Sequence, residues 1–210
     1  MEDVLAVYAR PYDPQWPVVC VDEKSKELHA DAAARPPRLP QPGRVARIDY
    51  EYERRGTANI FMAVEPLAGK RRVWITAQRT KQDFAELLRQ LADEEYVAAA
   101  KIVLVCDNLN THGPHVLYEQ YPPAEARRIA ERFEWHYTPE HGSWLNVAEI
   151  ELSVLEQQCL RRRFASQAFL ASEAAAWEGE RNQATAKIRW QFTAADARIK
   201  LRRLYPSLNI

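Results

Sequence analysis

The stretch KIVLVCDNLNTH, residues 101–112, decides the fold that the sequence predicts. Its five apolar residues, 102–106, form an unbroken run between Lys101 and Asp107, which is typical of a strand buried on both faces. Ligands usually bind at the carboxyl ends of strands in an α/β sheet, so Asp107 is a candidate site residue. The alternative is that Asp107 and Asn108 only begin a turn.

The composition is that of a globular chain of 210 residues, 47% of them hydrophobic, which can bury a sizeable core. No apolar run approaches the ~18 residues of a membrane span, and the N-terminus lacks the apolar segment of a signal peptide. We therefore expect no membrane partner. The three cysteines lie far apart, so we expect a reduced, cytoplasmic protein.

Charge is unevenly distributed along the chain, although the net charge is zero. Residues 157–210 carry ten Lys or Arg against four Asp or Glu. This separation is compatible with bases gathered along a polyanion and equally with ordinary solvated helices.

Apolar periodicity predicts an α/β fold, a mixed sheet with helices packed on it. We expect an antiparallel meander of three strands, followed by two strands that alternate with helices. The expected strands are 18–21, 58–65, 72–76, 102–106 and 135–137, and the expected helices are 80–97, 122–133, 144–163, 166–187 and 194–205. We divide the chain into a lead-in segment of residues 1–17, a core of residues 18–165 and a C-terminal helical extension of residues 166–210.

A proline-rich segment, RPPRLPQP at residues 35–42, lies between the first two expected strands. Four prolines in eight residues exclude a helix or a central strand. We interpret the segment as a stiff connector, and the alternative is a flap whose arginines face DNA.

Two expected strands end in an acid, at Asp22 and at Asp107. If these strands are neighbours, the two carboxylates converge at one edge of the sheet. Phosphodiester-cleaving sites hold two divalent ions ~3.5–4 Å apart and need a third carboxylate. The expected helix 144–163 offers Glu149, at the margin of its apolar face and near its N-terminus, whereas we interpret Glu151 and Glu156 as surface residues. Oxygen ligands of this kind favour Mg²⁺ or Mn²⁺.

Three sequence blocks carry a resemblance to a known family. They are DEKS at 22–25, DNLNTH at 107–112 and HGSWLNVAEIE at 141–151. In this order they resemble the catalytic domain of DDE transposases, in the bacterial insertion-sequence branch related to the mariner elements. Blocks at 50–69, 78–88 and 190–206 look similar too, so that the resemblance covers nearly the whole chain.

The resemblance implies an RNase H-like fold with a five-stranded sheet, in which residues 18–165 are the catalytic core. It implies a triad of Asp22, Asp107 and Glu149 that binds two Mg²⁺ or Mn²⁺ ions. The implied activity is DNA cleavage followed by strand transfer in cut-and-paste transposition, in a bacterial protein associated with the nucleoid when it acts on DNA. The 41 residues between Asp107 and Glu149 exceed the compact spacing of mariner relatives, and the expected helix 122–133 accounts for the excess.

The resemblance also suggests partners. DNA is expected as both element end and target, and a second copy of the chain is a further expected partner. Such transposases usually carry N-terminal helix-turn-helix domains, but here 21 residues precede Asp22. We interpret the chain as a catalytic fragment, one half of a split reading frame or a remnant, with recognition of element ends supplied by a separate helix-turn-helix domain.

Further side chains are candidates for contacts beside the triad or with DNA. Asn108 and His112 follow Asp107 closely, and Arg161, Arg162 and Arg163 end the helix of Glu149. The alternatives are an Asx turn at Asn108 and a favourable helix-dipole interaction for the arginines. Four histidines lie between 112 and 141, but no cysteine lies at ligand spacing, which disfavours a zinc site.

Trp135 and Trp144 are predicted as core residues rather than as stacking platforms for bases.

Two functions compete with transposition. One is a non-catalytic transposase remnant that binds DNA or a full-length partner. The other is an RNase H-like nuclease that acts on RNA–DNA hybrids or junctions, which the block at 141–151 disfavours.

Overall fold

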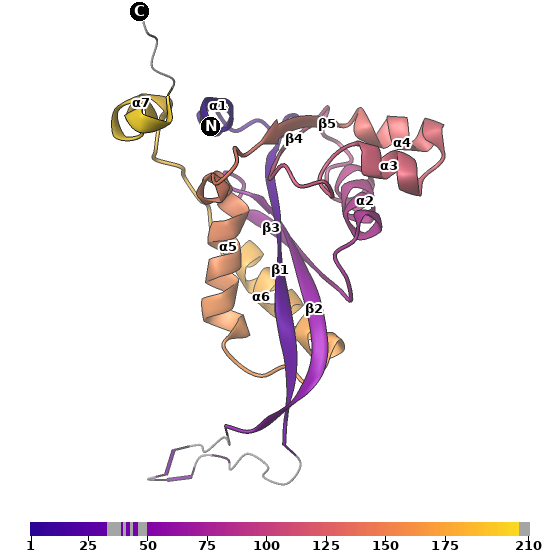
Figure 1. Cartoon of the computed structure of the whole chain (residues 1–210), viewed down its shortest axis with the longest axis vertical. Coiled ribbons are helices and arrows are strands. Elements are labelled where there is room, and N and C mark those ends of the chain that lie inside the picture. Colours follow the sequence, from indigo (N-terminus) through magenta and orange to yellow (C-terminus); the bar gives the residue numbers. More distant parts are fainter. Residues whose placement is uncertain (33–38, 40, 43, 46–49, 206–210) are drawn as a thin grey trace, which may run out of the picture.

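The computed structural model describes residues 1–32, 39, 41–42, 44–45 and 50–205. Within them lies one five-stranded sheet in the order β3-β2-β1-β4-β5 (Figure 1). β1, β2 and β3 pair antiparallel, and β4 and β5 run parallel to β1. The strands are β1 (Val18–Asp31), β2 (Tyr52–Glu65), β3 (Lys70–Thr76), β4 (Ile102–Cys106) and β5 (Phe133–Tyr137). This confirms the predicted mixed sheet of a meander and two parallel strands.

The first strand is longer than predicted. The expectation that it ends at Asp22 was wrong, because β1 continues to Asp31 in a ladder with β2. β1 and β2 leave the rest of the sheet as a long two-stranded ribbon, seen in the lower half of Figure 1. Most of β1 after Val21 is half-buried or exposed, so polar residues suffice there and the apolar run stops early.

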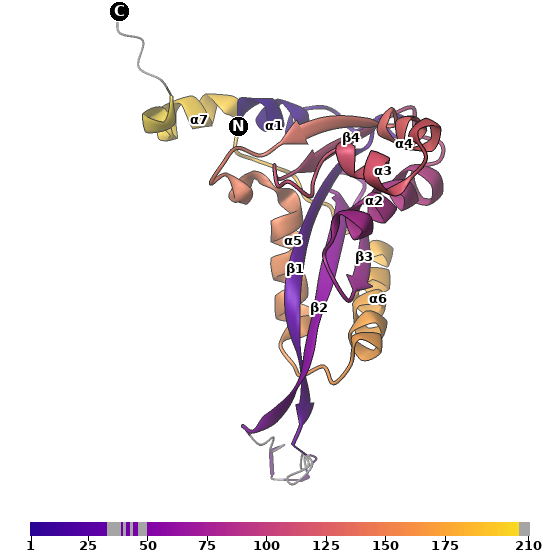
Figure 2. The ribbon, with the colours of Figure 1, turned by 45° about the vertical axis from the view of Figure 1, so that its right-hand side comes forward.

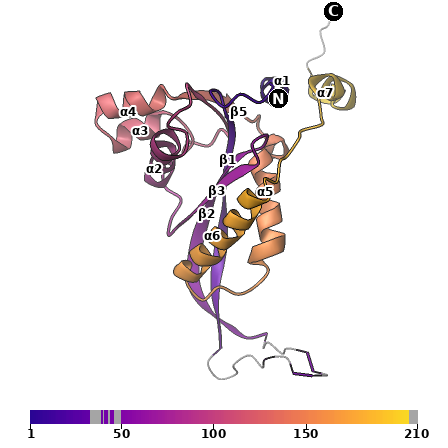
Figure 3. The same ribbon diagram turned by 180° about the vertical axis from the view of Figure 1, so that it is seen from behind.

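Helices cover both faces of the sheet (Figure 2). α2 (Lys81–Gln90), η1 (Leu91–Glu95), α3 (His115–Gln120) and α4 (Pro123–Ala130) pack on one face. α1 (Glu2–Tyr8), α5 (Val147–Leu155), its continuation η3 (Glu156–Leu160) and α6 (Gln167–Gln183) pack on the other, as Figure 3 shows from behind. α7 (Ala194–Lys200) and η4 (Arg202–Leu204) follow, with α7 against α1.

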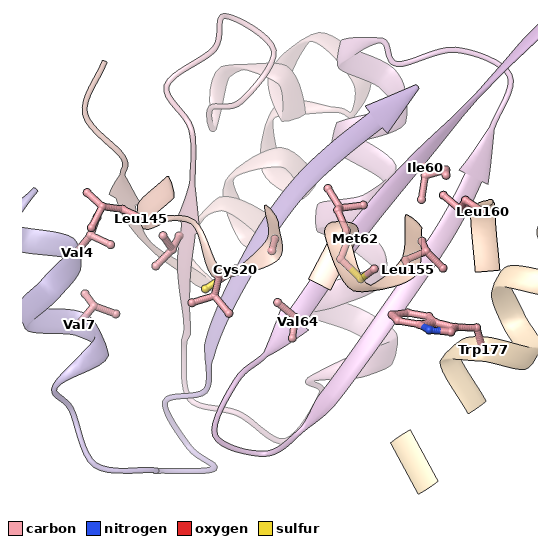
Figure 4. Close-up of a cluster of buried hydrophobic side chains, with 14 of the residues drawn as sticks. Val4, Val7, Cys20, Ile60, Met62, Val64, Leu145, Leu155, Leu160 and Trp177 are labelled. Carbon is pink, nitrogen blue, oxygen red and sulfur yellow. The ribbon is translucent and has the colours of Figure 1, made fainter. Parts of the chain in front are cut away.

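Side chains alternate between these two layers, as the period of a strand requires. In β1, Cys20 belongs to the layer under α5, whereas Val19 and Val21 belong to the layer under α2. Figure 4 shows the first layer, in which Met62 of the sheet lies beside the helical residue Leu155, and Cys20 lies further toward Leu145. Because Asp22 follows Cys20 by two residues, it projects from the α5 face.

The predicted helices are present, with differences at their ends. Thr80 caps α2 in a capping box with Asp83, which confirms the predicted cap at residue 80. The predicted start of the helix 144–163 at Trp144 was wrong: η2 (Ser143–Leu145) is a separate 3₁₀ turn, and Asn146 caps α5. α3 was not predicted. None of the helices in the described part of the chain is long and apolar enough to cross a membrane. The interpretation of residues 35–42 concerns a segment of which most lies outside the described residues.

Candidate functional site

The register of the sheet brings Asp22 next to Asp107. β1 and β4 pair through Val18↔Val103, Val19↔Leu104 and Cys20↔Val105. Two further residues in the same register lead to Asp22 on one strand and Asp107 on the other. The two acids therefore leave the sheet at the point where β4 ends and β1 continues.

Asn146 attaches the start of α5 to the same point. Its side-chain oxygen accepts the backbone N–H of Ala148, and its side-chain nitrogen donates to the Val21 carbonyl at 2.8 Å and lies 3.4 Å from Asp22 Oδ2. Asn146 is 1% exposed, so these bonds replace water. Sequence reasoning missed Asn146, although an Asn before an apolar helical run is a recognisable cap.

Glu149 lies in the first turn of α5, where it is half-buried. Its carboxylate and that of Asp107 both act on Asp22. Burial raises the pKa of the Asp22 carboxyl to about 7, and the negative charges of Glu23, Asp107 and Glu149 add to the effect. The structure thus brings the three predicted acids together within electrostatic range.

His112 and Glu23 support Asp107 from the other face of the sheet. His112 Nδ1 contacts Asp107 Oδ1, and its Nε2 lies 3.1 Å from Glu23 Oε2. The ring also packs on Phe84 of α2, with the ring centres 4.4 Å apart. Burial lowers the pKa of His112, but its contacts with the Asp107 and Glu23 carboxylates outweigh this and raise the pKa to about 9.

His112 therefore contacts Asp107, and its role beside a triad stays a prediction, whereas Glu23 as its second partner was missed. Glu23 Oε2 is buried, and within the described residues its contact with His112 is an ion pair without hydrogen-bond geometry. No local signal indicates this role, because the partner is 89 positions away in the sequence.

A cavity of about 470 Å³ opens beside Asp107. Asn108, Thr138 and Ser143 are among the residues that line it, so Asn108 faces the space next to the candidate site. The cavity is large enough to hold part of a nucleotide chain.

The three arginines after α5 lie elsewhere. Arg163 binds Asp31 at 2.8 Å, and Asp31 is nine residues along β1 from Asp22, which is about 30 Å at ~3.3 Å per residue. Arg162 pairs with Glu173, and Arg161 lines a second cavity, of about 380 Å³, against α6. The structure does not bring these arginines to the acids, and a contact with DNA stays a prediction.

The other two acids of the helix have different surroundings. The interpretation of Glu151 as a surface residue was wrong, because it is 0% exposed and binds Arg71 at 3.1 Å and Arg181 at 2.6 Å. Its partners come from β3 and α6, which the helical pattern of α5 cannot reveal. Glu156 is half-buried and pairs with Lys24 at 2.9 Å.

The sequence matches the family of DDE superfamily endonucleases over residues 17–171. The chain belongs to this family. No curated protein matches the chain. A solved structure, the Mos1 mariner paired end complex with Mn, is similar with a TM-score of 0.54 and 16% sequence identity, over 87% of this chain and 55% of that chain. A pre-cleavage Mos1 transpososome also matches, with a TM-score of 0.30 and 16% identity over 87% of this chain and 58% of that chain.

The likeness to the paired end complex confirms the predicted RNase H-like fold. This member of the DDE endonucleases spans about half the length of the Mos1 chains that it resembles.

The donor chemistry of the site fits a divalent ion. Asp22, Asp107 and Glu149 offer the carboxylate oxygens that Mg²⁺ and Mn²⁺ prefer, and a bound cation would oppose the effect of the negative charges of Asp107 and Glu149 on Asp22. In the described part of the chain, no three His, Cys, Asp or Glu side chains are arranged so that they could hold a metal ion. The contact between Asp107 and His112 turns one of the carboxylates toward an internal partner instead.

Proposed function

We propose that the chain is the catalytic domain of a DNA transposase, which cleaves phosphodiester bonds and transfers the freed strand. The observation that carries the proposal is the register of β1 and β4, which sets Asp22 beside Asp107, with Glu149 of α5 acting on the same carboxyl. The membership of the DDE endonucleases supports the reaction class.

Asp22, Asp107 and Glu149 would hold two Mg²⁺ or Mn²⁺ ions. When bound, such ions supply Lewis-acid stabilisation of the charge that develops on the phosphodiester oxygens. The chain itself orients the three carboxylates: Asn146 fixes α5 against Val21, and the Glu23–His112 pair holds the Asp107 carboxylate. The cavity lined by Asn108 and Ser143 receives the DNA strand.

Two displacements at phosphorus complete the reaction. In the first, water attacks the scissile phosphate, the bond to the 3′ oxygen breaks, and a free 3′-OH and a 5′-phosphate result. In the second, this 3′-OH attacks a phosphate of the target DNA, forms a new P–O bond and displaces the 3′ oxygen of the target strand. The partners of the proposed function are element-end and target DNA, a second copy of the chain and a separate helix-turn-helix domain that recognises the ends.

The direct test is nicking of element-end duplex DNA in the presence of Mg²⁺ or Mn²⁺. Wild type is expected to nick, and Asp22→Asn, Asp107→Asn and Glu149→Gln are expected to reduce nicking to background. The matched control is Glu156→Gln, a change of the same kind on the continuation of the same helix, which is expected to leave nicking unchanged. Undiminished activity in a triad variant removes that residue from the site.

The alternative is a non-catalytic remnant that binds DNA or a full-length partner. Mn²⁺ binding by wild type without nicking or strand-transfer products on any DNA would favour it. Cleavage restricted to RNA–DNA hybrids or junctions would instead favour an RNase H-like nuclease that is not a transposase.

A further inference from the structure

An aromatic cluster lies at the surface next to α5. It consists of Trp144, Trp190 and Phe192, which we call the aromatic platform. Trp144 is 43% exposed, so the prediction that it belongs to the core was wrong. Its ring lies 6.4 Å from the ring of Trp190, at an angle of 23°, and 5.6 Å from the ring of Phe192, which it meets edge-on.

The platform is held rigidly from behind. The Trp190 indole N–H donates to the Phe192 carbonyl at 2.7 Å, and the Tyr8 ring packs 5.1 Å from that of Trp190. The Tyr8 hydroxyl donates to the carbonyl of Leu145 at 2.7 Å and so fixes the turn that presents Trp144. An exposed aromatic ring in a fixed position loses little conformational entropy when a ligand stacks on it.

The platform borders the candidate site. Trp144 and Ser143 belong to the same 3₁₀ turn, and Ser143 lines the cavity beside Asp107. Asn146, two residues after Trp144, binds Val21 and approaches Asp22. A strand that reaches the acids through this cavity therefore passes close to Trp144.

Basic residues lie near the platform in space or along the chain. Lys200 Nζ lies 5.6 Å from the Phe192 ring and 3.7 Å from Asp196 Oδ1, and Lys187 and Arg189 are exposed on the segment that leads to Trp190. Arg198 pairs with Glu2, but as far as the structure describes the chain, Lys187 and Arg189 form no ion pair. This segment lies after residue 171, where the match to the family ends.

We infer that the aromatic platform stacks an unpaired base of the DNA strand that enters the candidate site. Stacking needs the face of a base, which an unpaired nucleotide exposes and a paired duplex hides. The cations Lys187 and Arg189, unpaired within the described residues, lie on the segment that leads to Trp190 and attract the phosphates that flank such a base. The inference rests on the proposed function only for the origin of the DNA strand.

The test compares two labelled DNAs, a duplex with a single-stranded 3′ overhang and a blunt duplex of the same paired sequence. Binding of the full chain is measured by fluorescence anisotropy in EDTA, so that cleavage plays no part. Trp144→Ala is expected to weaken binding of the overhang DNA by about tenfold, the range for one stacked base, and to leave the blunt duplex unchanged. Trp144→Phe is expected to restore most of the affinity.

Two controls frame this result. Trp16 is also 43% exposed and lies before β1, so Trp16→Ala is expected to bind both DNAs like wild type. Arg189→Gln is expected to weaken both DNAs and to lower the salt dependence, because a phosphate contact does not distinguish them. Thermal unfolding verifies that each variant is folded.

Equal binding of the overhang DNA by Trp144→Ala and wild type overturns the inference, and so does an equal loss for both DNAs. Nicking by wild type in the same preparation separates the two proposals. If wild type nicks but Trp144→Ala binds normally, stacking fails and the proposed function stands. Trp144-dependent binding without nicking supports stacking alone, and wild type that binds neither DNA overturns stacking.

Discussion

Glu149 and Glu151 lie two residues apart on α5, and their surroundings differ completely. Glu149 is half-buried, and its negative charge and that of Asp107 both act on the Asp22 carboxyl. Glu151 is fully buried between the guanidinium groups of Arg71 and Arg181. We call the first group the acidic cluster and the second the buried charge cluster.

The buried charge cluster supplies its own countercharge. Arg71 donates to the carbonyls of Gly69 at 2.8 Å, Arg181 at 3.2 Å and Ala186 at 2.7 Å, in addition to Glu151. The cluster therefore ties α5 to β3 and to the end of α6, three segments that Figure 3 shows side by side. A charge buried in this way is tolerated only because nearly all its bonds are formed inside the protein.

The acidic cluster lacks such compensation. Among the described residues its one cationic partner is His112, on Asp107; burial, and to a smaller extent the neighbouring negative charges, raises the pKa of Asp22. The two acids of one helix therefore differ in compensation: Glu151 is paired inside the protein, whereas Glu149 is half-buried near like charges, where the proposed function places a cation. Four substitutions test this comparison.

The largest expected effect is that of Glu151→Gln. Removal of Glu151 leaves the buried Arg71 and the half-buried Arg181 without their shared countercharge, which costs about 3–5 kcal/mol. Urea unfolding followed by circular dichroism measures the free energy of unfolding. Glu156→Gln, which breaks a half-exposed pair with Lys24, is the control and is expected to cost less than about 1 kcal/mol. A similar small loss in both variants would contradict the assignment of Glu151 as a structural acid.

The second effect concerns the backbone beside Arg71. Gly69 has φ +71°, and an added Cβ would lie 2.8 Å from the backbone carbonyl of Thr185. Gly69→Ala is expected to lower the free energy of unfolding by about 2–4 kcal/mol, because left-handed strain and overpacking add. Gly56 has φ +93° in open space, so Gly56→Ala is expected to show only the strain, about 1–2 kcal/mol. Equal losses would mean that the contact with Thr185 does not constrain the cluster.

Asn146→Ala is expected to have a smaller effect on stability and a clear effect on activity. Loss of the cap costs about 1 kcal/mol, and the altered support of the carboxylates is expected to reduce nicking by about 10–100-fold. Ser166 caps α6, and its side-chain oxygen accepts the Phe169 N–H at 3.2 Å. Ser166→Ala removes this cap and serves as the control, with a similar expected loss of stability. Nicking that falls equally in both variants would show that Asn146 acts through stability alone.

The smallest expected effect on stability is that of Glu149→Gln. Because the substitution removes repulsion, the free energy of unfolding is expected to change by less than about 0.5 kcal/mol or to rise. Mn²⁺ is expected to raise the melting temperature of wild type but not of the variant, since a ligand stabilises only the state that binds it. Equal Mn²⁺ stabilisation of both proteins would exclude Glu149 as a ligand.

The sequence by itself determined the parts of the fold that local patterns report. The apolar run 102–106 specifies β4, Asp107 ends it, and Thr80 and Ser166 cap the helices that follow them. Helical periodicity also placed Glu149 at the margin of a buried face. These features depend on neighbours within a few residues, so their physical causes are all present in a short stretch.

Only the tertiary structure decided which charges meet. Glu151 is buried because Arg71 of β3 and Arg181 of α6 supply its countercharges. Glu23 of β1 meets His112 of the loop after β4, a neighbouring strand. The length of β1 and the ring contacts of Trp144 likewise depend on distant segments, the ladder with β2 and the contact with Trp190. A single acid in a sequence does not indicate whether a cation will lie beside it, because the free energy of a charge is set by partners that folding brings together.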